Sequence, residues 1–395
     1  MNPSRAKPLQ LDTVMWIASC TKLMTSICVM QLVERGQLRL DDPVYDIIPE
    51  LRSRTVITGL TDAQVPIERP HKQPITLRRL LSHSSGLSYD HIPHPLIAAW
   101  LKQQTTSPSS SNKLVERFSH PLVFEPGEGW SYSPSIDYAG LMVERVTNMS
   151  LEAYMKKNIW EPLGIRDMTF FLSTRPDMSA RFADMSARGA DGKVMYIEGY
   201  TPYLDEKGNE MADCMGGHGV FATPREYIKV LKAVLRCGEG KEGDILSKES
   251  IDEMFKPQLT EKSTESINST LKDDLVCGFP LLLLLLLLRP PLTHIYQVNR
   301  LMGGTPMESP KSWGLGGLIV LDDCPDGRKA GTMIWGGLPN LLWFVDRKTG
   351  LTGFYATQVV PPGDEKCVDM NSAFVEGIYD MRSSRGHGKV WSSNL

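Results

Sequence analysis

The sequence predicts an α+β fold in which an antiparallel sheet is flanked by helices and carries an inserted, mostly helical region. Three features support this prediction. An apolar helical pattern starts near Ser19, consecutive strand patterns fill the C-terminal third, and a last helical pattern follows them. Helices at both ends with consecutive strands between them are typical of one sheet layer covered by helices.

The helical patterns differ in how much of their surface is apolar. From Ser19 to Gly36, apolar residues occur on most sides, which is typical of a central buried helix. A further helix is expected after Thr223, where a Thr-Pro pair is an N-terminal capping signal. The other helical patterns cover residues 74–87, 113–119, 137–160 and about 368–382.

Four strand patterns follow one another in the C-terminal third. They read S-W-G-L-G-G-L-I-V-L, G-T-M-I-W-G-G, L-L-W-F-V-D and L-T-G-F-Y-A-T. The segments D-C-P-D-G, G-L-P-N and D-R-K-T-G separate them, and these compositions are typical of turns. We therefore expect an antiparallel meander.

These patterns divide the chain into two regions and one insertion. Residues 1–44 and 219–395 are expected to form the sheet region, with the apolar helix and the strand that ends in W-G-G. Residues 45–218 are expected to form the inserted helical region, and residues 278–298 a leucine-rich insertion.

The composition excludes several classes of protein. A formal net charge of −3 over 395 residues gives no general attraction to nucleic acid or to anionic membranes. Seven cysteines without a C-x-x-C pair argue against a disulfide framework and indicate a reducing compartment, which we take to be the cytoplasm. The octa-leucine run at 281–288 is too short to cross a membrane, which takes about 20 apolar residues. We expect no membrane role for it.

The spacing S-x-x-K, which can join a serine nucleophile to a lysine base, occurs four times. The copies begin at Ser4, Ser19, Ser110 and Ser269. At Ser19 the hydroxyl would lie at the N-terminus of the most apolar helix, where free amides favour developing negative charge. Lys22 would lie one turn further on, and burial would lower its pKa so that the neutral amine could take the serine proton. The alternative is a structural role, in which Ser19 is an N-cap residue and Lys22 a surface lysine.

A tyrosine in a tight turn is a second candidate. P-G-E-G-W-S-Y-S-P-S places Tyr132 just ahead of a helix. A tyrosine whose phenolate is stabilised by a neighbouring lysine could relay the proton between nucleophile and leaving group. Alternatively, Tyr132 is a turn residue that packs on Trp130.

Two triplets compete to form the strand beside the nucleophile. Lys348-Thr349-Gly350 matches the K-T-G of penicillin-recognising enzymes, but D-R-K-T-G is also an ordinary turn. Trp335-Gly336-Gly337 ends a strand, and its glycines would let a substrate approach the backbone closely. We interpret K-T-G as a turn and W-G-G as the wall of the site.

Other catalytic signatures are absent from the sequence. It contains no G-x-S-x-G, no P-loop and no H-E-x-x-H motif. His91 and His94 are too isolated to predict a metal site. We expect neither a metal nor a cofactor.

Taken together, these motifs resemble the class C β-lactamase-like serine hydrolases and acyltransferases. I-A-S-C-T-K is similar to the nucleophile motif, I-T-L-R-R-L-L-S-H-S-S-G-L to the H-T-S-G-L segment and W-S-Y-S-P-S to the tyrosine loop. I-W-E-P-L-G-I-R-D-M-T-F and G-G-H-G-V-F-A-T-P-R-E-Y match the framework, so the resemblance runs from about residue 16 to 360. It implies a β-lactamase/transpeptidase-like fold.

The segments S-W-G-L-G-G and W-G-G-L-P-N-L-L-W narrow the resemblance to fungal transesterases typified by the lovastatin acyltransferase. This resemblance implies transfer of a polyketide acyl group from a thioester donor to a hydroxyl of a secondary-metabolite acceptor. The donor would be an acyl carrier domain, such as that of a polyketide synthase, or a CoA thioester. The acceptor would be a small molecule.

The resemblance also implies roles for particular residues. Ser19 would be the acyl-enzyme nucleophile, with Lys22 and Tyr132 as the base pair. The N–H groups of Ser19 and Leu338 would bind the oxyanion. Arg117 and Tyr203 fall where the family lines its acceptor pocket.

Two alternatives remain open at this point. The same site would serve an ester hydrolase, in which water replaces the alcohol. The family also has several dozen residues ahead of the nucleophile, whereas 18 residues precede Ser19 here. We therefore expect the N-terminal strands of the sheet to be missing, and an inactive family member is the second alternative.

Overall fold

A computed structural model describes most of the chain. The described residues are 8–90, 94–189, 191–241, 244–272, 274–276, 295–297 and 309–385. The predicted insertion at 278–298 lies outside them, apart from Ile295–Gln297.

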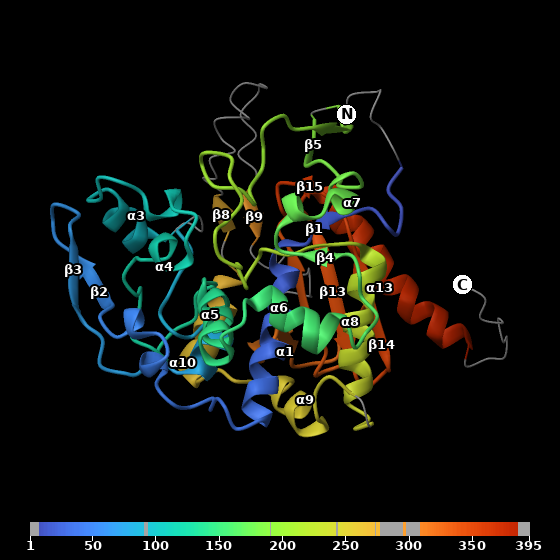
Figure 1. The fold of residues 1–395 in the computed structure, drawn as a ribbon, viewed down its shortest axis with the longest axis horizontal. Helices are drawn as coiled ribbons and strands as arrows, with labels where there is room; N and C mark the ends of the chain where they lie inside the picture. Colours follow the sequence, from blue (N-terminus) through green and yellow to red (C-terminus); the bar gives the residue numbers. More distant parts are fainter. Residues whose placement is uncertain are drawn as a thin grey trace.

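The main sheet has five antiparallel strands in the order β10-β11-β12-β13-β14 (Figure 1). The strands follow one another along the chain, so they form the meander that the sequence predicts. Their bounds are β10 Lys311–Trp313, β11 Leu318–Val320, β12 Met333–Gly337, β13 Leu341–Asp346 and β14 Leu351–Tyr355.

One predicted strand is in fact two. S-W-G-L-G-G-L-I-V-L contains a turn, and β10 and β11 pair on either side of it with Trp313 opposite Leu318. The Gly314 N–H donates to the Gly317 carbonyl oxygen at 2.9 Å, which closes the turn. The expectation of a single strand was wrong because the glycines permit a reversal that the apolar pattern does not reveal.

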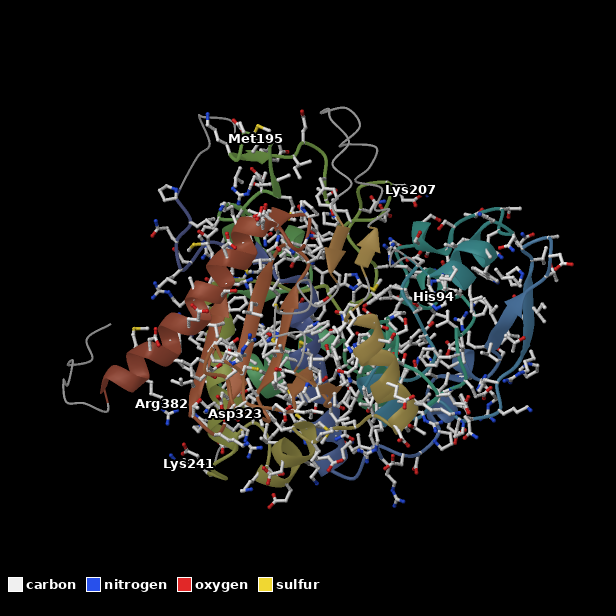
Figure 2. The ribbon with its side chains drawn as sticks, turned by 180° about the vertical axis from the view of Figure 1, so that it is seen from behind. His94, Met195, Lys207, Lys241, Asp323 and Arg382 are labelled. Atoms are coloured by element: carbon white, nitrogen blue, oxygen red, sulfur yellow. The ribbon has the colours of Figure 1, made fainter. Side chains whose placement is uncertain are left out.

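Helices cover both faces of the sheet, and the alternation of side chains along the strands shows which helix covers which face. Phe354 of β14 contacts Tyr227 of α8 (Pro224–Cys237), with ring centroids 4.6 Å apart. Phe344 of β13 points to the other face and stacks on Tyr379 of α13 (Glu365–Arg385) at 5.8 Å. Seen from behind, α13 lies across the strands (Figure 2).

The apolar N-terminal pattern forms α1 (Thr21–Glu34), which follows a short 3-10 turn at Ala18–Cys20. Every residue from Thr21 to Leu32 is buried. The prediction of a central buried helix is therefore confirmed.

Helices α3, α4 and α5 lie with the β2–β3 hairpin in the half of the molecule away from the main sheet, whereas α6, α7 and α9 lie nearer to that sheet (Figure 1). The predicted helix at 137–160 is interrupted, because Asn148 adopts a left-handed conformation (φ 52°) that ends α5. Side-chain oxygens cap α2, α6, α9 and α10 at their N-termini. The helices are α2 Leu77–Leu81, α3 Pro95–Leu101, α4 Leu114–Arg117, α5 Ser135–Thr147, α6 Leu151–Met155, α7 Pro176–Ser179, α9 Lys248–Met254 and α10 Glu261–Thr270. Short 3-10 turns lie at Val44–Asp46, Pro49–Leu51, Pro108–Ser110 and Leu172–Thr174, and a π-helical turn at Lys156–Trp160 continues α6.

Four smaller sheets complete the described fold, in the orders β1-β7-β4, β15-β5-β6, β2-β3 and β8-β9. Their strands are β1 Met15–Trp16, β2 Thr55–Leu60, β3 Pro66–Pro70, β4 Met168–Thr169, β5 Ser186–Arg188, β6 Val194–Tyr196, β7 Phe221–Ala222, β8 Asp274–Val276, β9 Ile295–Gln297 and β15 Val359–Val360.

Among the described strands, β14 pairs only with β13 and forms an edge of the main sheet. The expectation that N-terminal strands of the sheet are missing stays a prediction. Within the described part of the chain, no helix is both long and apolar enough to cross a membrane.

Candidate active site

The turn before α1 presents Ser19 at the surface of a buried helix. Ala18 has φ 46°, in the left-handed region that residues with a Cβ rarely adopt. Ser19 follows it and is partly exposed, whereas Lys22, one turn further along, is 1 % exposed. A non-glycine residue in this region carries backbone strain, which is often found at functional sites.

Three predicted residues meet at the Ser19 hydroxyl. The Lys22 Nζ lies 3.2 Å from Ser19 Oγ, and the Tyr132 hydroxyl donates to the same Oγ at 2.7 Å. The Lys22 amine also lies 4.5 Å from the centre of the Tyr132 ring. One serine oxygen is thus in hydrogen-bond contact with two groups that can accept or return a proton.

The other S-x-x-K copies have no comparable surroundings. Lys113 is largely exposed and pairs with Glu116, and Lys272 is exposed. The copy at Ser4 lies outside the described residues. Burial of the lysine distinguishes Ser19–Lys22 from the two other described copies.

The loop that carries Tyr132 is hydrogen-bonded to a second loop, which contains His83 and Tyr89. The Tyr89 N–H donates to the Tyr132 carbonyl oxygen at 3.3 Å, and the Ser131 N–H donates to the His83 carbonyl oxygen at 3.1 Å. The His83 Nδ1 is 2.9 Å from Ser133 Oγ. His83 belongs to the segment that resembles H-T-S-G-L, and its contacts fix the position of Tyr132.

The W-G-G strand runs beside the nucleophile turn. The Trp335 Nε1–H donates to the Tyr132 hydroxyl at 3.1 Å. A Cβ on Gly337 would lie 2.5 Å from the Ile17 carbonyl oxygen, so the strand touches the turn that carries Ser19. Gly336 and Leu338 flank this contact, and Leu338 packs against the apolar cluster that contains Ala18.

K-T-G lies in the turn between β13 and β14. The Thr349 N–H donates to the carboxylate of Asp346 at 3.0 Å, and Gly350 has φ 68°. The triplet therefore has the turn conformation that its flanking residues predict.

The two remaining predicted residues, Arg117 and Tyr203, have different surroundings. Arg117 donates to the carbonyl oxygens of Ser109 and Ser111, which ties α4 to the polar loop before it. Tyr203 packs edge-on against Phe221 at 5.2 Å, in the same cluster as Ala18 and Leu338.

The structure also shows polar residues near the site that sequence reasoning missed. The Lys22 amine contacts the Tyr89 hydroxyl and the Gly217 carbonyl oxygen, and both of these residues are hydrogen-bonded to Asp137. Only the glycine pair Gly216–Gly217 in the framework motif could have drawn attention to this region, because the three residues are far apart in the sequence.

Burial changes the protonation of the central groups. Loss of solvent lowers the pKa of Lys22 to about 7, against the opposing charge of Asp137. Loss of solvent raises the pKa of Tyr132 despite its hydrogen bonds with Ser19 and Trp335. Burial therefore opposes the phenolate form of Tyr132, and its role in a proton relay stays a prediction. Lys22 is the group that can accept a proton in the resting protein.

No group of three or more His, Cys, Asp or Glu side chains in the described part of the chain could hold a metal ion. His94 lies there, whereas His91 does not.

The fold, the partly exposed serine beside a buried lysine, and the tyrosine that donates to the serine are typical of serine acyl enzymes of the penicillin-recognising type. The chain belongs to the beta-lactamase family, whose family model, described as Beta-lactamase, matches residues 2–373. The resemblance that the motifs indicate is therefore confirmed.

Among curated proteins, the chain is 38% identical over 375 residues to a lovastatin esterase from Penicillium rubens, covering 94% of this chain and 86% of the esterase. It is 38% identical over 376 residues to a monacolin J acid methylbutanoyltransferase from Aspergillus terreus, covering 94% of this chain and 83% of the transferase. Among solved structures, a mutant of simvastatin synthase from Aspergillus terreus superposes with a TM-score of 0.81 at 38% identity, covering 97% and 85% of the two chains. The similarity extends over nearly the whole chain.

Proposed function

We propose that this protein is a serine acyltransferase that moves a polyketide acyl group from a thioester donor to a hydroxyl of a secondary-metabolite acceptor through an acyl-enzyme on Ser19. The observation that carries the proposal is the shared contact of Lys22 Nζ and the Tyr132 hydroxyl with Ser19 Oγ, at 3.2 and 2.7 Å. The names of the transferase relatives support the substrate class.

In the acylation step, neutral Lys22 takes the proton of Ser19 as Oγ bonds to the thioester carbonyl carbon. The C–S bond then breaks, and the leaving thiolate receives the proton from the lysine ammonium through the Tyr132 hydroxyl. A lysine with a pKa of about 7 can serve in both directions, because its two protonation states are nearly equal in free energy at neutral pH.

In the second step, an acceptor alcohol attacks the acyl-enzyme. Its proton passes to Lys22, the ester bond to Ser19 breaks, and the proton returns to Ser19 Oγ. The donor and the acceptor therefore use the same site in turn, and ping-pong kinetics are expected.

The tetrahedral intermediate of each step needs hydrogen-bond donors for its oxyanion. We assign this role to the backbone N–H groups of Ser19 and Leu338, on either side of the contact between Ile17 and Gly337. Trp335 contributes to the same site by donating a hydrogen bond that fixes the Tyr132 hydroxyl.

The proposal also places the acceptor and its surroundings. Arg117 and Tyr203 would contact the acceptor, and an acyl carrier domain of a polyketide synthase or CoA would supply the thioester.

The two regions of the chain would contribute different parts of the site. The sheet region (1–44 and 219–395) would contribute the nucleophile and W-G-G, and the inserted region (45–218) would contribute the tyrosine. The described cysteines are all free, which supports a cytoplasmic location.

The second candidate function is ester hydrolysis. It is favoured by the lovastatin esterase relative, which is as similar to this chain as the transferases are. In this case, water replaces the alcohol in the second step and no other residue changes its role.

The two candidates differ in product. Purified protein would be incubated with a 2-methylbutyryl thioester, with and without monacolin J acid, and the products separated by mass. Formation of the ester only when the acceptor is present supports the transferase, whereas free acid as the only product in both reactions refutes it.

A third possibility, an inactive family member, is tested without a substrate. A fluorophosphonate probe should label the wild-type protein but not Ser19→Ala. Absence of labelling from a cooperatively folded wild-type protein would refute both enzymatic functions.

A further inference from the structure

A buried carboxylate lies behind the candidate base. Asp137, in the first turn of α5, is completely buried. It accepts hydrogen bonds from the Gly217 N–H at 2.9 Å and from the Tyr89 hydroxyl at 3.0 Å. The His218 Nδ1 lies 3.5 Å from the same carboxylate. Burying a charge is costly, so a carboxylate kept at this position calls for a reason.

The two groups that bind Asp137 also bind Lys22. The Lys22 amine donates to the Gly217 carbonyl oxygen at 2.7 Å and lies 3.3 Å from the Tyr89 hydroxyl. A Cβ on Gly217 would lie 2.3 Å from Asp137 Oδ2, so the backbone approaches the carboxylate as closely as glycine allows. Asp137 and Lys22 are thus joined by two bridges, one through a side chain and one through the backbone.

Most of the titratable groups around Lys22 are neutral at neutral pH. Burial raises the pKa values of Cys20, Tyr89 and Tyr132, so the thiol and both phenols are neutral. Burial likewise lowers the pKa values of His83 and of His218, the latter against the opposing effect of Asp137, so both imidazoles are neutral at neutral pH.

Besides Lys22, two charged side chains remain among the described groups that act on these residues, namely Arg117 and Asp137. Arg117 acts on Tyr89 and His218 and is itself bonded to loop carbonyls. Burial works to raise the pKa of Asp137, but His218, Lys22 and the Gly217 N–H together bring it below its usual value. Asp137 is therefore an anion at neutral pH and faces the amine.

We propose that Asp137 is a positioning residue for Lys22: through Tyr89 and Gly217 it holds the amine against Ser19, and its charge stabilises the ammonium that forms when Lys22 takes the serine proton. The inference rests on the proposed function of Lys22. It assigns a reason to the buried carboxylate, because a proton transferred into a site without a counter-charge would be poorly stabilised.

Removing the charge has two separable consequences. Asp137→Asn keeps the size of the side chain but loses the anion, so protonated Lys22 becomes less stable. The two bridging contacts place the charges within about 6 Å, and a unit charge at that distance changes a pKa by about one to two units. The pH below which Lys22 is protonated and inactive should fall by that amount. The rate at high pH should fall about tenfold, because the amine is held less firmly.

The experiment measures the second-order rate of Ser19 labelling by a fluorophosphonate probe between about pH 5 and pH 9. Asp346→Asn is the matched control. Asp346 is 1 % exposed and accepts hydrogen bonds from the Tyr379 hydroxyl at 2.7 Å and from backbone N–H groups, but it lies in the K-T-G turn. It should lower thermal stability without moving the pH profile.

A folded Asp137→Asn protein whose pH midpoint equals that of the wild type would overturn the inference. Tyr89→Phe tests the hydrogen-bonded connection between Asp137 and Lys22 independently. It keeps the charge of Asp137 but removes the hydroxyl that contacts both residues. It should therefore lower the labelling rate at high pH without lowering the pH midpoint. If Asp137→Asn does not fold, an unchanged high-pH rate in Tyr89→Phe overturns the bridge. Absence of labelling in the wild-type protein would instead refute the proposed function, so the two failures are distinguishable.

Discussion

Replacing Gly337 by alanine tests whether the W-G-G strand forms the wall of the site. The added Cβ would lie 2.5 Å from the Ile17 carbonyl oxygen, 3.0 Å from Leu341 Cδ1 and 3.4 Å from Cys20 Sγ. The leucine methyl can rotate away, but the carbonyl oxygen belongs to the turn that carries Ser19. The strand or the turn therefore has to move.

The size of the movement follows from contact distances. A carbon and a carbonyl oxygen approach to about 3.3 Å, so Ile17 and residue 337 must separate by about 0.8 Å. A misplacement of about 1 Å at a reacting centre costs on the order of 100-fold in rate. We therefore expect Gly337→Ala to label with the fluorophosphonate probe about 30- to 100-fold more slowly than the wild type. Overpacking of this kind should also lower the free energy of unfolding by about 1–3 kcal/mol.

The assay compares the labelling rate with the urea unfolding curve of the same preparation. Gly353→Ala is the control, because its Cβ would lie 2.7 Å from Phe344 Cε1 and 2.9 Å from Ile378 Cδ1, on the sheet face that α13 covers. It should lose stability but label at the wild-type rate. A Gly337→Ala protein that is destabilised and still labels at the wild-type rate would refute the reasoning.

Three further outcomes are expected. Hydrolysis of p-nitrophenyl butyrate by the wild type should rise with pH and level off above about pH 7, because Lys22 accepts a proton only when neutral and its pKa is about 7; a flat profile from about pH 5 to 8 would contradict this. Tyr132→Phe keeps the ring contacts but removes the donor to Ser19, so kcat should fall about 10²- to 10⁴-fold at nearly unchanged Tm; wild-type turnover would exclude Tyr132 from the proton path. Thr223→Ala removes the cap that accepts from the Glu226 N–H and should lower the free energy of unfolding by about 1 kcal/mol in urea, with unchanged labelling per folded molecule.

The parts of the site that could be predicted from the sequence are those carried by local patterns. Ser19 and Lys22 are one helical turn apart, so an apolar helix is sufficient to predict their contact. Tyr132 and Trp335 are each recognisable from a short motif, although their contact joins residues 203 positions apart. These residues could be assigned to one site because each belongs to a short sequence motif that can be recognised without knowledge of the fold.

Asp137 could not be found in this way. It interacts with Lys22 through Tyr89 and Gly217, and these four residues come from four separate segments. An aspartate in the first turn of a helix is also common, since it interacts favourably with the helix dipole. Burial made it distinctive, and burial depends on the complete packing.

The errors in the fold have a similar origin. Apolar periodicity is averaged over a window, whereas a chain reversal needs only a few residues with special conformations. The predicted helix at 137–160 ends at Asn148 and resumes after Ser150, whose side chain caps α6. The S-W-G-L-G-G-L-I-V-L segment likewise reverses at Gly314–Gly317. In both cases the apolar pattern identified the correct type of element but not its interruption.

The choice between an alcohol and water cannot depend on the groups that contact Ser19 Oγ, because those groups act in the same way on either nucleophile. We expect it to depend on the free energy that the acceptor gains by burying apolar area against the protein surface next to Ser19. Tyr203 and Leu338 are only partly buried, and they pack on the buried cluster that contains Trp16, Phe221 and Ala18, directly before the nucleophile. An alcohol with a large apolar body gains about 25 cal/mol for each Å² that it buries against such a surface, whereas water gains nothing. Transferase and esterase relatives of equal similarity to this chain are therefore expected to differ around this cluster and to share the serine, lysine and tyrosine.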